Sequence, residues 1–66
     1  MKNITVNGTE HQTEERDLDA LVLSLGLDKT TVATAVNGQF ISRAQRSTRL
    51  IETGDRIEIL SPQQGG

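Results

Sequence analysis

The residues of this chain that offer reactive chemistry stand at its end, where Ser61-Pro62-Gln63-Gln64 leads into Gly65-Gly66. A terminal glycine presents a carboxylate with no side chain beside it, so the group can enter a narrow site and adopt backbone angles that are closed to other residues. A carboxylate becomes a useful acyl donor only after an activating group provides a better leaving group than oxide. We therefore interpret the rest of the chain as a small folded body that presents this carboxylate to other proteins.

The remaining polar side chains give little reason to expect catalysis within the chain. There is no cysteine, and the single histidine, His11, cannot form a zinc site alone. The acidic residues between positions 14 and 19 are close in sequence, but they precede and begin a predicted helix, where capping and the helix dipole explain them. We expect no metal or cofactor bound by this chain and no enzymatic activity of its own.

Size and composition predict a single small domain without nucleic-acid or membrane partners. A chain of 66 residues buries only roughly 60% of its unfolded surface. The net charge of −2 and the single aromatic residue, Phe40, do not suit nucleic-acid binding. No apolar run approaches the roughly 20 residues of a membrane span, and the N-terminus lacks the apolar stretch of a signal peptide. We expect a cytoplasmic protein that is monomeric when free.

Two Asn-Gly pairs predict two β-hairpins. They are Asn7-Gly8, between strands over residues 2–6 and 9–13, and Asn37-Gly38, between strands over residues 32–36 and 39–41. Asn-Gly is the strongest short hairpin signal, because both central residues of a type I′ turn need a positive φ. We assign Asn37-Gly38 no role beyond its turn. The sequence leaves open which set of the second hairpin faces the core: Val32, Thr34 and Val36, or Ala33 and Ala35.

A helix is predicted between the hairpins. Its apolar residues follow the i, i+3, i+4, i+7 spacing of one helical face: Leu18, Leu21, Val22 and Leu25. Asp17 is a suitable N-cap, and Gly26 stands where a left-handed residue ends a helix. Leu27 can then fold back on Val22, as in a Schellman ending.

The last third of the chain predicts a polar loop and one more strand. Residues 42–53 are interpreted as a loop with a short helical turn, anchored by Leu50, followed by a turn at Gly54-Asp55. In the strand over residues 56–60, Ile57 and Ile59 share one face. Pro62 has no N–H for a sheet ladder, so we expect a domain over residues 1–60 and a flexible tail over residues 61–66.

These elements predict an α+β fold of order ββαβββ. The last strand buries its apolar face best in the middle of the sheet, beside the first strand. That placement leaves the polar strand over residues 9–13 at an edge, where polar strands are tolerated. The result is a mixed sheet of about five strands packed on one helix.

Two surfaces are candidates for contact with a partner. On the sheet face opposite the helix, Leu60 is the best candidate for an exposed apolar contact, joined by Phe40 or Ile41 depending on the facing of the second hairpin. Arg43, Arg46 and Arg49 recur every three residues. They form either a basic patch for an acidic partner or an ordinary solvated loop.

In its element order and in several short sequence motifs, the chain resembles the small sulfur carrier proteins of thiamine thiazole biosynthesis, which belong to the ubiquitin-like β-grasp superfamily. The resemblance rests on Ala35-Val36-Asn37-Gly38, Arg43, Thr48-Arg49-Leu50, Gly54-Asp55-Arg56-Ile57-Glu58-Ile59 and Gly65-Gly66. It spans the whole chain. One departure is that Ser61-Pro62-Gln63-Gln64 is more polar than the segment expected before the glycines in this family.

The resemblance implies a protein that carries sulfur on Gly66. An adenylyltransferase of the ubiquitin-activating type would use ATP and magnesium to adenylate its carboxylate, and a cysteine desulfurase or sulfurtransferase would supply the sulfur. The product is a thiocarboxylate that thiazole synthase consumes. Gly65 and Gly66 would thread into these partners, and Leu60, Phe40, Ile41 and Arg43 would contact them. Two alternatives are a carrier for molybdopterin synthesis and a ubiquitin-like protein modifier, and a third is a β-grasp binding module whose Gly-Gly is incidental.

Overall fold

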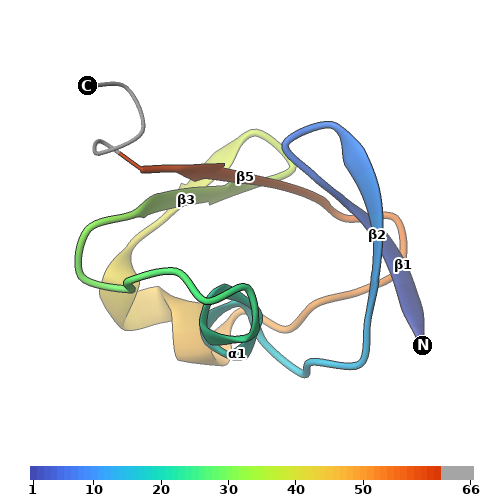
Figure 1. Cartoon of the computed structure of the whole chain (residues 1–66), viewed down its shortest axis with the longest axis horizontal. Helices are drawn as coiled ribbons and strands as arrows, with labels where there is room; N and C mark the ends of the chain where they lie inside the picture. The colour runs from blue at the N-terminus through green and yellow to red at the C-terminus, as the bar shows by residue number, and fades with distance from the viewer. Residues whose placement is uncertain (62–66) are drawn as a thin grey trace.

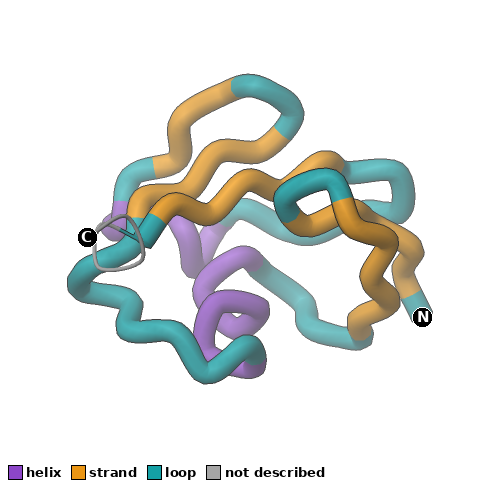
Figure 2. The backbone as a smooth tube through the Cα atoms, turned by 45° about the horizontal axis from the view of Figure 1, so that its top comes forward, coloured by secondary structure: helices purple, strands orange, loops and turns teal. Residues whose placement is uncertain are grey.

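The structure, a computed structural model that describes residues 1–61, is a five-stranded sheet with one α-helix on one of its faces (Figure 1). The elements are β1 (Lys2–Val6), β2 (Thr9–Thr13), α1 (Leu18–Ser24), β3 (Ala33–Val36), β4 (Gln39–Ile41), the 3₁₀ helix η1 (Arg43–Thr48) and β5 (Arg56–Leu60). Figure 2 shows the helices on one side of the strands. The predicted α+β architecture and element order are confirmed.

Both predicted hairpins form around their Asn-Gly turns. Asn7 and Gly8 have φ angles of 51° and 83°, and Asn37 and Gly38 have φ angles of 54° and 81°. These positive values are those that a type I′ turn requires, and they match the twist of the strands that the turns join. β1 pairs with β2, and β3 pairs with β4, in antiparallel ladders.

The two hairpins meet on β5, which lies in the middle of the sheet. The strand order is β2-β1-β5-β3-β4, with β5 parallel to β1 and antiparallel to β3. This order confirms the predicted central place of the last strand and the edge position of the polar strand β2. Each residue of β5 therefore lies next to another strand or next to the turn at the end of a strand.

The helix α1 has the predicted ends. The Asp17 side chain accepts a hydrogen bond from the main-chain N–H of Ala20 at 2.8 Å, so Asp17 is the N-cap. At the other end Gly26 has a φ of 75°, and its N–H donates to the Leu23 carbonyl at 3.0 Å. The N–H of Leu27 donates to the Val22 carbonyl at 3.3 Å, which completes a Schellman motif.

The core lies between α1 and the inner face of the sheet. Its buried apolar residues come from every part of the described chain: Ile4, Leu18, Leu21, Val22, Val32, Val36, Ile41, Ile51, Ile57 and Ile59. The structure thereby decides which side chains of the second hairpin pack against the core. Val32, Thr34 and Val36 are buried, whereas Ala33 is exposed and Ala35 is half-buried on the outer face.

The anchor of the segment between β4 and β5 is Ile51, and the prediction that Leu50 anchors it is wrong. Ile51 is buried, while Leu50 is 46% exposed. The segment is extended here and pairs with the start of α1: the Leu18 N–H donates to the Arg49 carbonyl, and the Ile51 N–H to the Arg16 carbonyl, both at 3.0 Å. Because side chains alternate in an extended chain, Leu50 points away from the core.

The three arginines of this segment do not form a basic patch, because Arg46 is buried with 2% exposure. Its guanidinium donates to the Thr34 hydroxyl at 3.0 Å, the Lys29 carbonyl at 2.9 Å and the Val32 carbonyl at 2.7 Å. These bonds satisfy a cation that would otherwise be costly to bury. Arg46 thus ties η1 to β3 and to the loop before it.

No helix in this part of the chain has both the length and the apolar character needed to cross a membrane.

Candidate functional site

The candidate site is the outer face of the sheet next to the end of β5. Leu60 is the last residue of β5, and the predicted tail follows it. Gly65 and Gly66, the residues predicted to enter partner active sites, lie outside the described residues. The structure therefore describes the folded part of the site, up to Ser61.

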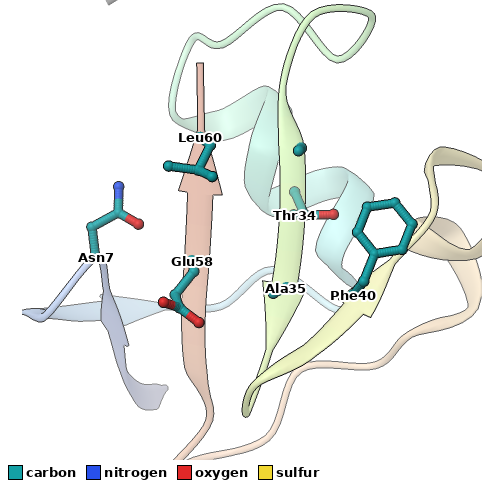
Figure 3. A pocket seen from close by; sticks show the side chains of 7 residues that line it. Asn7, Thr34, Ala35, Phe40, Glu58 and Leu60 are labelled. Carbon is teal, nitrogen blue, oxygen red and sulfur yellow. The ribbon is translucent and has the colours of Figure 1, made fainter. Parts of the chain in front are cut away.

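A shallow apolar groove of about 220 Å³ lies on this face, opposite α1 (Figure 3). It is lined by residues from four strands or their turns: Asn7, Ala33, Thr34, Ala35, Phe40, Glu58 and Leu60. Leu60 is 73% exposed and Phe40 is 67% exposed. Large apolar side chains that share an exposed hollow are a feature of binding surfaces. The structure thus brings together two of the residues predicted to contact a partner.

The two other predicted contact residues do not belong to this groove. Ile41 is 8% exposed and belongs to the core, so the prediction that it joins the exposed surface is wrong. It follows Phe40 in β4, and successive strand residues point to opposite faces of a sheet, so exposure of Phe40 buries Ile41.

Arg43 lies on another side of the molecule. It lines a separate depression of about 430 Å³ with residues of α1, of η1 and of the loop before β3. Hydrogen bonds from the Thr30 side chain and main chain hold the pKa of the nearby Asp28 carboxyl below its usual value, and the charge of Arg43 adds to this effect. A partner that reaches both Leu60 and Arg43 would have to cover two faces.

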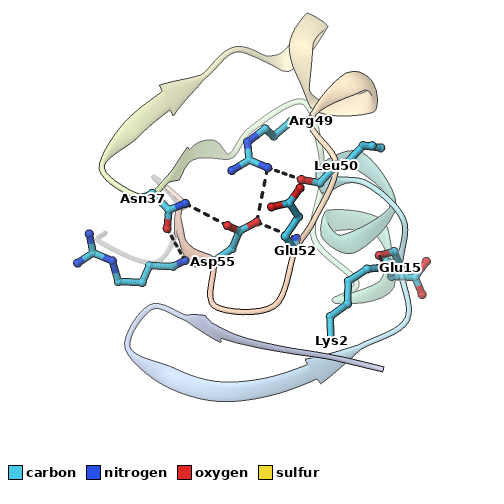
Figure 4. A network of polar contacts seen from close by, with 8 residues as sticks. Lys2, Glu15, Asn37, Arg49, Leu50, Glu52 and Asp55 are labelled. Atoms are coloured by element: carbon cyan, nitrogen blue, oxygen red, sulfur yellow. Dashed lines mark hydrogen bonds and ion pairs between the residues drawn. The ribbon is translucent and has the colours of Figure 1, made fainter.

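The start of β5 is held by a polar network that the sequence did not predict (Figure 4). Asp55 is buried, and one of its carboxylate oxygens accepts a hydrogen bond from Asn37 Nδ2 at 3.0 Å. The other accepts from the Glu52 N–H at 2.9 Å and forms an ion pair with Arg49 at 3.5 Å. Asn37 Oδ1 also accepts from the N–H of Arg56 at 2.8 Å. Asn37 therefore has a role beyond its turn.

The end of β5 is held by the side chain of Asn7, which the sequence did not single out either. Asn7 Oδ1 accepts a hydrogen bond from the Ile59 N–H at 2.8 Å, and Asn7 Nδ2 donates to the Ile59 carbonyl at 3.1 Å. One sequence signal pointed to these roles: both turns begin with asparagine. Glycine would also suit that position of a type I′ turn, so the choice of asparagine indicates a use for its side chain. Asparagine additionally offers one acceptor and two donors.

Among residues 1–61, no group of three or more His, Cys, Asp or Glu side chains is placed to hold a metal ion. What this face offers is an apolar hollow with one carboxylate, that of Glu58, next to the end of the strand that leads to the tail. Such a surface can dock a partner, and the reacting group would have to come from the residues after Leu60.

Comparison with known proteins agrees with this arrangement. Residues 2–66 match the model of the ThiS family. The crystal structure of a thiamine biosynthesis protein (ThiS) from Geobacter metallireducens has the same fold, with a TM-score of 0.80 and 24% sequence identity. That match covers 89% of this chain and 91% of the other chain. It confirms the predicted β-grasp fold. No match was found among curated proteins.

Proposed function

Since this chain belongs to the ThiS family and is a sulfur carrier of thiamine thiazole synthesis, we propose that it carries the sulfur on the carboxylate of Gly66. The observation that supports this proposal most is the family match itself, which runs from residue 2 to Gly66 and so includes Gly65-Gly66. The family match also favours thiamine synthesis over the two alternatives, molybdopterin synthesis and protein modification.

Two steps convert the carboxylate into a thiocarboxylate. In the first, an oxygen of the Gly66 carboxylate attacks the α-phosphorus of ATP, pyrophosphate leaves, and a mixed anhydride with AMP forms. In the second, a sulfur nucleophile on a partner attacks the carbonyl carbon of Gly66, the carbon–oxygen bond to AMP breaks, and AMP leaves. With a cysteine persulfide as the sulfur donor, the product is an acyl disulfide. A thiolate then attacks the donor's cysteine sulfur, the sulfur–sulfur bond to the acyl group breaks, a disulfide forms on the donor, and the thiocarboxylate is freed. The catalytic groups and the magnesium ion for these steps belong to the partners.

The absence of side chains on the last two residues suits these steps. A β-carbon on Gly66 would crowd attack at the carbonyl, and one on Gly65 would widen the segment that enters the partner. The partners that we propose are an adenylyltransferase of the ubiquitin-activating type, a cysteine desulfurase or sulfurtransferase, and thiazole synthase. Thiazole synthase would consume the thiocarboxylate as its sulfur source.

We propose that the adenylyltransferase docks on the groove around Leu60 and Phe40. The six residues from Ser61 to Gly66 span at most about 20 Å when extended, so a partner that reacts with Gly66 must have its reactive centre within that distance of Leu60. The groove is an exposed apolar surface within that reach. Glu58 is exposed in the same groove, so we expect a cationic group on the partner opposite it.

The experiment that tests the first step is the exchange of labelled pyrophosphate into ATP by the adenylyltransferase of the same organism. We expect exchange to require this chain and to be lost when Gly66 is deleted, because the exchange reports formation of the Gly66 adenylate. Variants changed at Leu60 should still support exchange, but at higher concentrations of the chain. Exchange that persists without Gly66 would contradict the proposal.

A further inference from the structure

The side chain of Asn7 extends the sheet where the main chain of β1 can no longer do so. The main-chain N–H of Asn7 donates to the Ile57 carbonyl at 2.8 Å, which continues the parallel ladder between β1 and β5. At Asn7 the chain turns, with a φ of 51°. The side-chain amide then supplies the next acceptor and the next donor, to the N–H and the carbonyl of Ile59.

This amide supplies the acceptor and the donor that two successive peptide groups of a longer β1 would have supplied. The ladder between β1 and β5 pairs Thr5 with Arg56 and Val6 with Ile57, and it goes no further by main chain. On its other side β5 pairs with β3 as far as Leu60, opposite Ala33. Asn7 therefore secures the end of β5 from the β1 side.

The same residue lies beside the groove. Figure 3 shows Asn7 and Leu60 on neighbouring elements along the groove lining. One amide thus contacts the residue before Leu60 and lines the surface to which Leu60 belongs. The two hydrogen bonds of this amide therefore lie next to both the proposed docking surface and the last residue of β5.

We propose that Asn7 is a positioning residue for the transfer chemistry: its amide fixes Ile59 and Leu60, and so fixes where the following residues leave the sheet relative to a partner docked in the groove. This inference rests on the proposed function, because it assumes that the residues after Leu60 deliver Gly66 to that partner. We assign Asn7 no chemical step in the reaction. Its contribution is orientation, and misplacement of a reacting group by about 1 Å can slow a reaction by about a hundredfold.

Asn37 provides a matched control. Asn7→Gly and Asn37→Gly both create a Gly-Gly turn, and glycine suits the φ angles of 51° and 54° at these positions. Each variant also removes an Oδ1 atom that accepts a hydrogen bond from a β5 N–H, that of Ile59 or that of Arg56. The two changes therefore differ in which end of β5 they release and in the acceptor that loses the Nδ2 donor, the Ile59 carbonyl or the Asp55 carboxylate.

The experiment compares three quantities in both variants: the hydrogen exchange rates of the Ile59 and Arg56 amides, the urea midpoint, and the rate of adenylation at saturating adenylyltransferase. We expect Asn7→Gly to speed exchange at Ile59 about tenfold, because it removes the acceptor of the Ile59 N–H. We also expect it to slow adenylation about tenfold, whereas Asn37→Gly should leave adenylation within about twofold of the wild type.

The inference is overturned if both variants slow adenylation equally, or if Asn7→Gly adenylates like the wild type although Ile59 exchanges faster. If Asn7→Gly does not fold, Asn7→Asp replaces it, since the carboxylate keeps an acceptor for the Ile59 N–H, loses the donor and faces the Ile59 carbonyl with a charged oxygen. Its adenylation rate should lie below that of the wild type, and a wild-type rate would count against the inference. Failure of the wild type to be adenylated at Gly66 would instead remove the proposed function.

Discussion

Each end of β5 is hydrogen-bonded to the asparagine of an Asn-Gly turn, but the two asparagines lie in different surroundings. At each end an asparagine that begins an Asn-Gly turn donates its main-chain N–H to β5, from Asn7 to Ile57 and from Asn37 to Arg56, both at 2.8 Å. At each end Oδ1 of that asparagine accepts from a β5 N–H, also at 2.8 Å. The ends differ in the acceptor of Nδ2, which is the buried carboxylate of Asp55 at the start and the main-chain carbonyl of Ile59 at the end.

The two ends of β5 also differ in the charge and burial of the groups that hold them. The start of β5 is tied by charged and buried groups, since Asp55 also binds the Glu52 N–H and Arg49. The end of β5 is tied by neutral hydrogen bonds of an exposed residue, next to the groove and the segment that leads to Gly66. We infer that the start of β5 contributes mainly to the stability of the fold and that the end of β5 contributes mainly to the binding surface.

Asp55→Ala should have the largest effect, and on stability. The change removes a buried carboxylate and leaves Asn37 Nδ2 and the Glu52 N–H without their acceptor, which should lower the free energy of unfolding by about 3 kcal/mol. Urea denaturation measures this loss. The matched control is Glu58→Ala, which removes an exposed acid within β5 and should change stability by less than about 0.5 kcal/mol. Equal losses in the two variants would contradict the assignment of stability to the start of β5.

Leu60→Asp should have the next largest effect, and on partner binding. It places a charge in the apolar groove next to Glu58 and should weaken binding of the adenylyltransferase by about 2 kcal/mol. Because Leu60 is exposed, the free energy of unfolding should change by no more than about 0.5 kcal/mol. Titration calorimetry with the partner and urea denaturation of the free chain measure the two quantities. A variant that loses stability but binds normally would reverse the roles of the two ends.

The smallest expected effect is the difference of about 1 kcal/mol in stability within a pair of isosteric changes, which tests the comparison itself. Asn37→Asp brings a second carboxylate to the position 3.0 Å from Asp55 Oδ1, and we expect it to cost about 2 kcal/mol of stability at neutral pH. Asn7→Asp loses a hydrogen bond from an exposed residue and should cost about 1 kcal/mol. Thermal or urea unfolding of both variants gives the difference. A larger loss from Asn7→Asp would show that the end of β5 is the more tightly held.

Much of the fold could be predicted because its signals are local. The two Asn-Gly turns and the spacing of apolar residues in α1 are properties of short segments, and both gave the correct elements. The central place of β5 followed from its buried apolar face and from the polar character of β2. The facing of the β3–β4 hairpin could not be decided, because a strand has two faces and either set of residues in β3 could have turned inward.

The errors concern residues whose partners are distant in sequence. Ile51 replaced Leu50 as the anchor because the segment pairs with residues 16–18, and this pairing fixes which side chain turns inward. Arg46 is buried because carbonyl and hydroxyl oxygens from residues 29, 32 and 34 surround its guanidinium. Neither arrangement has a signal in the local sequence.

The candidate site was predicted in part. Strand alternation placed Leu60 on the outer face, and exposure of Phe40 followed once the facing of its hairpin was known. Asn7 and Asn37 were missed because a type I′ turn already explains asparagine at those positions, and only the tertiary structure shows what their side chains bind. The roles of Gly65 and Gly66 remain predictions, which rest on the family and on the chemistry of a terminal carboxylate.

The central claim is that the sulfur is carried at the end to which β5 leads, on Gly66. The most direct measurement is the intact mass of the chain after incubation with its adenylyltransferase, ATP, magnesium and a sulfur donor, followed by fragmentation to locate the change. We predict that one oxygen is replaced by one sulfur, that the change maps to Gly66, and that a chain lacking Gly66 gives no such product. An unchanged mass for the full chain, or a sulfur located on any residue other than Gly66, would contradict the account.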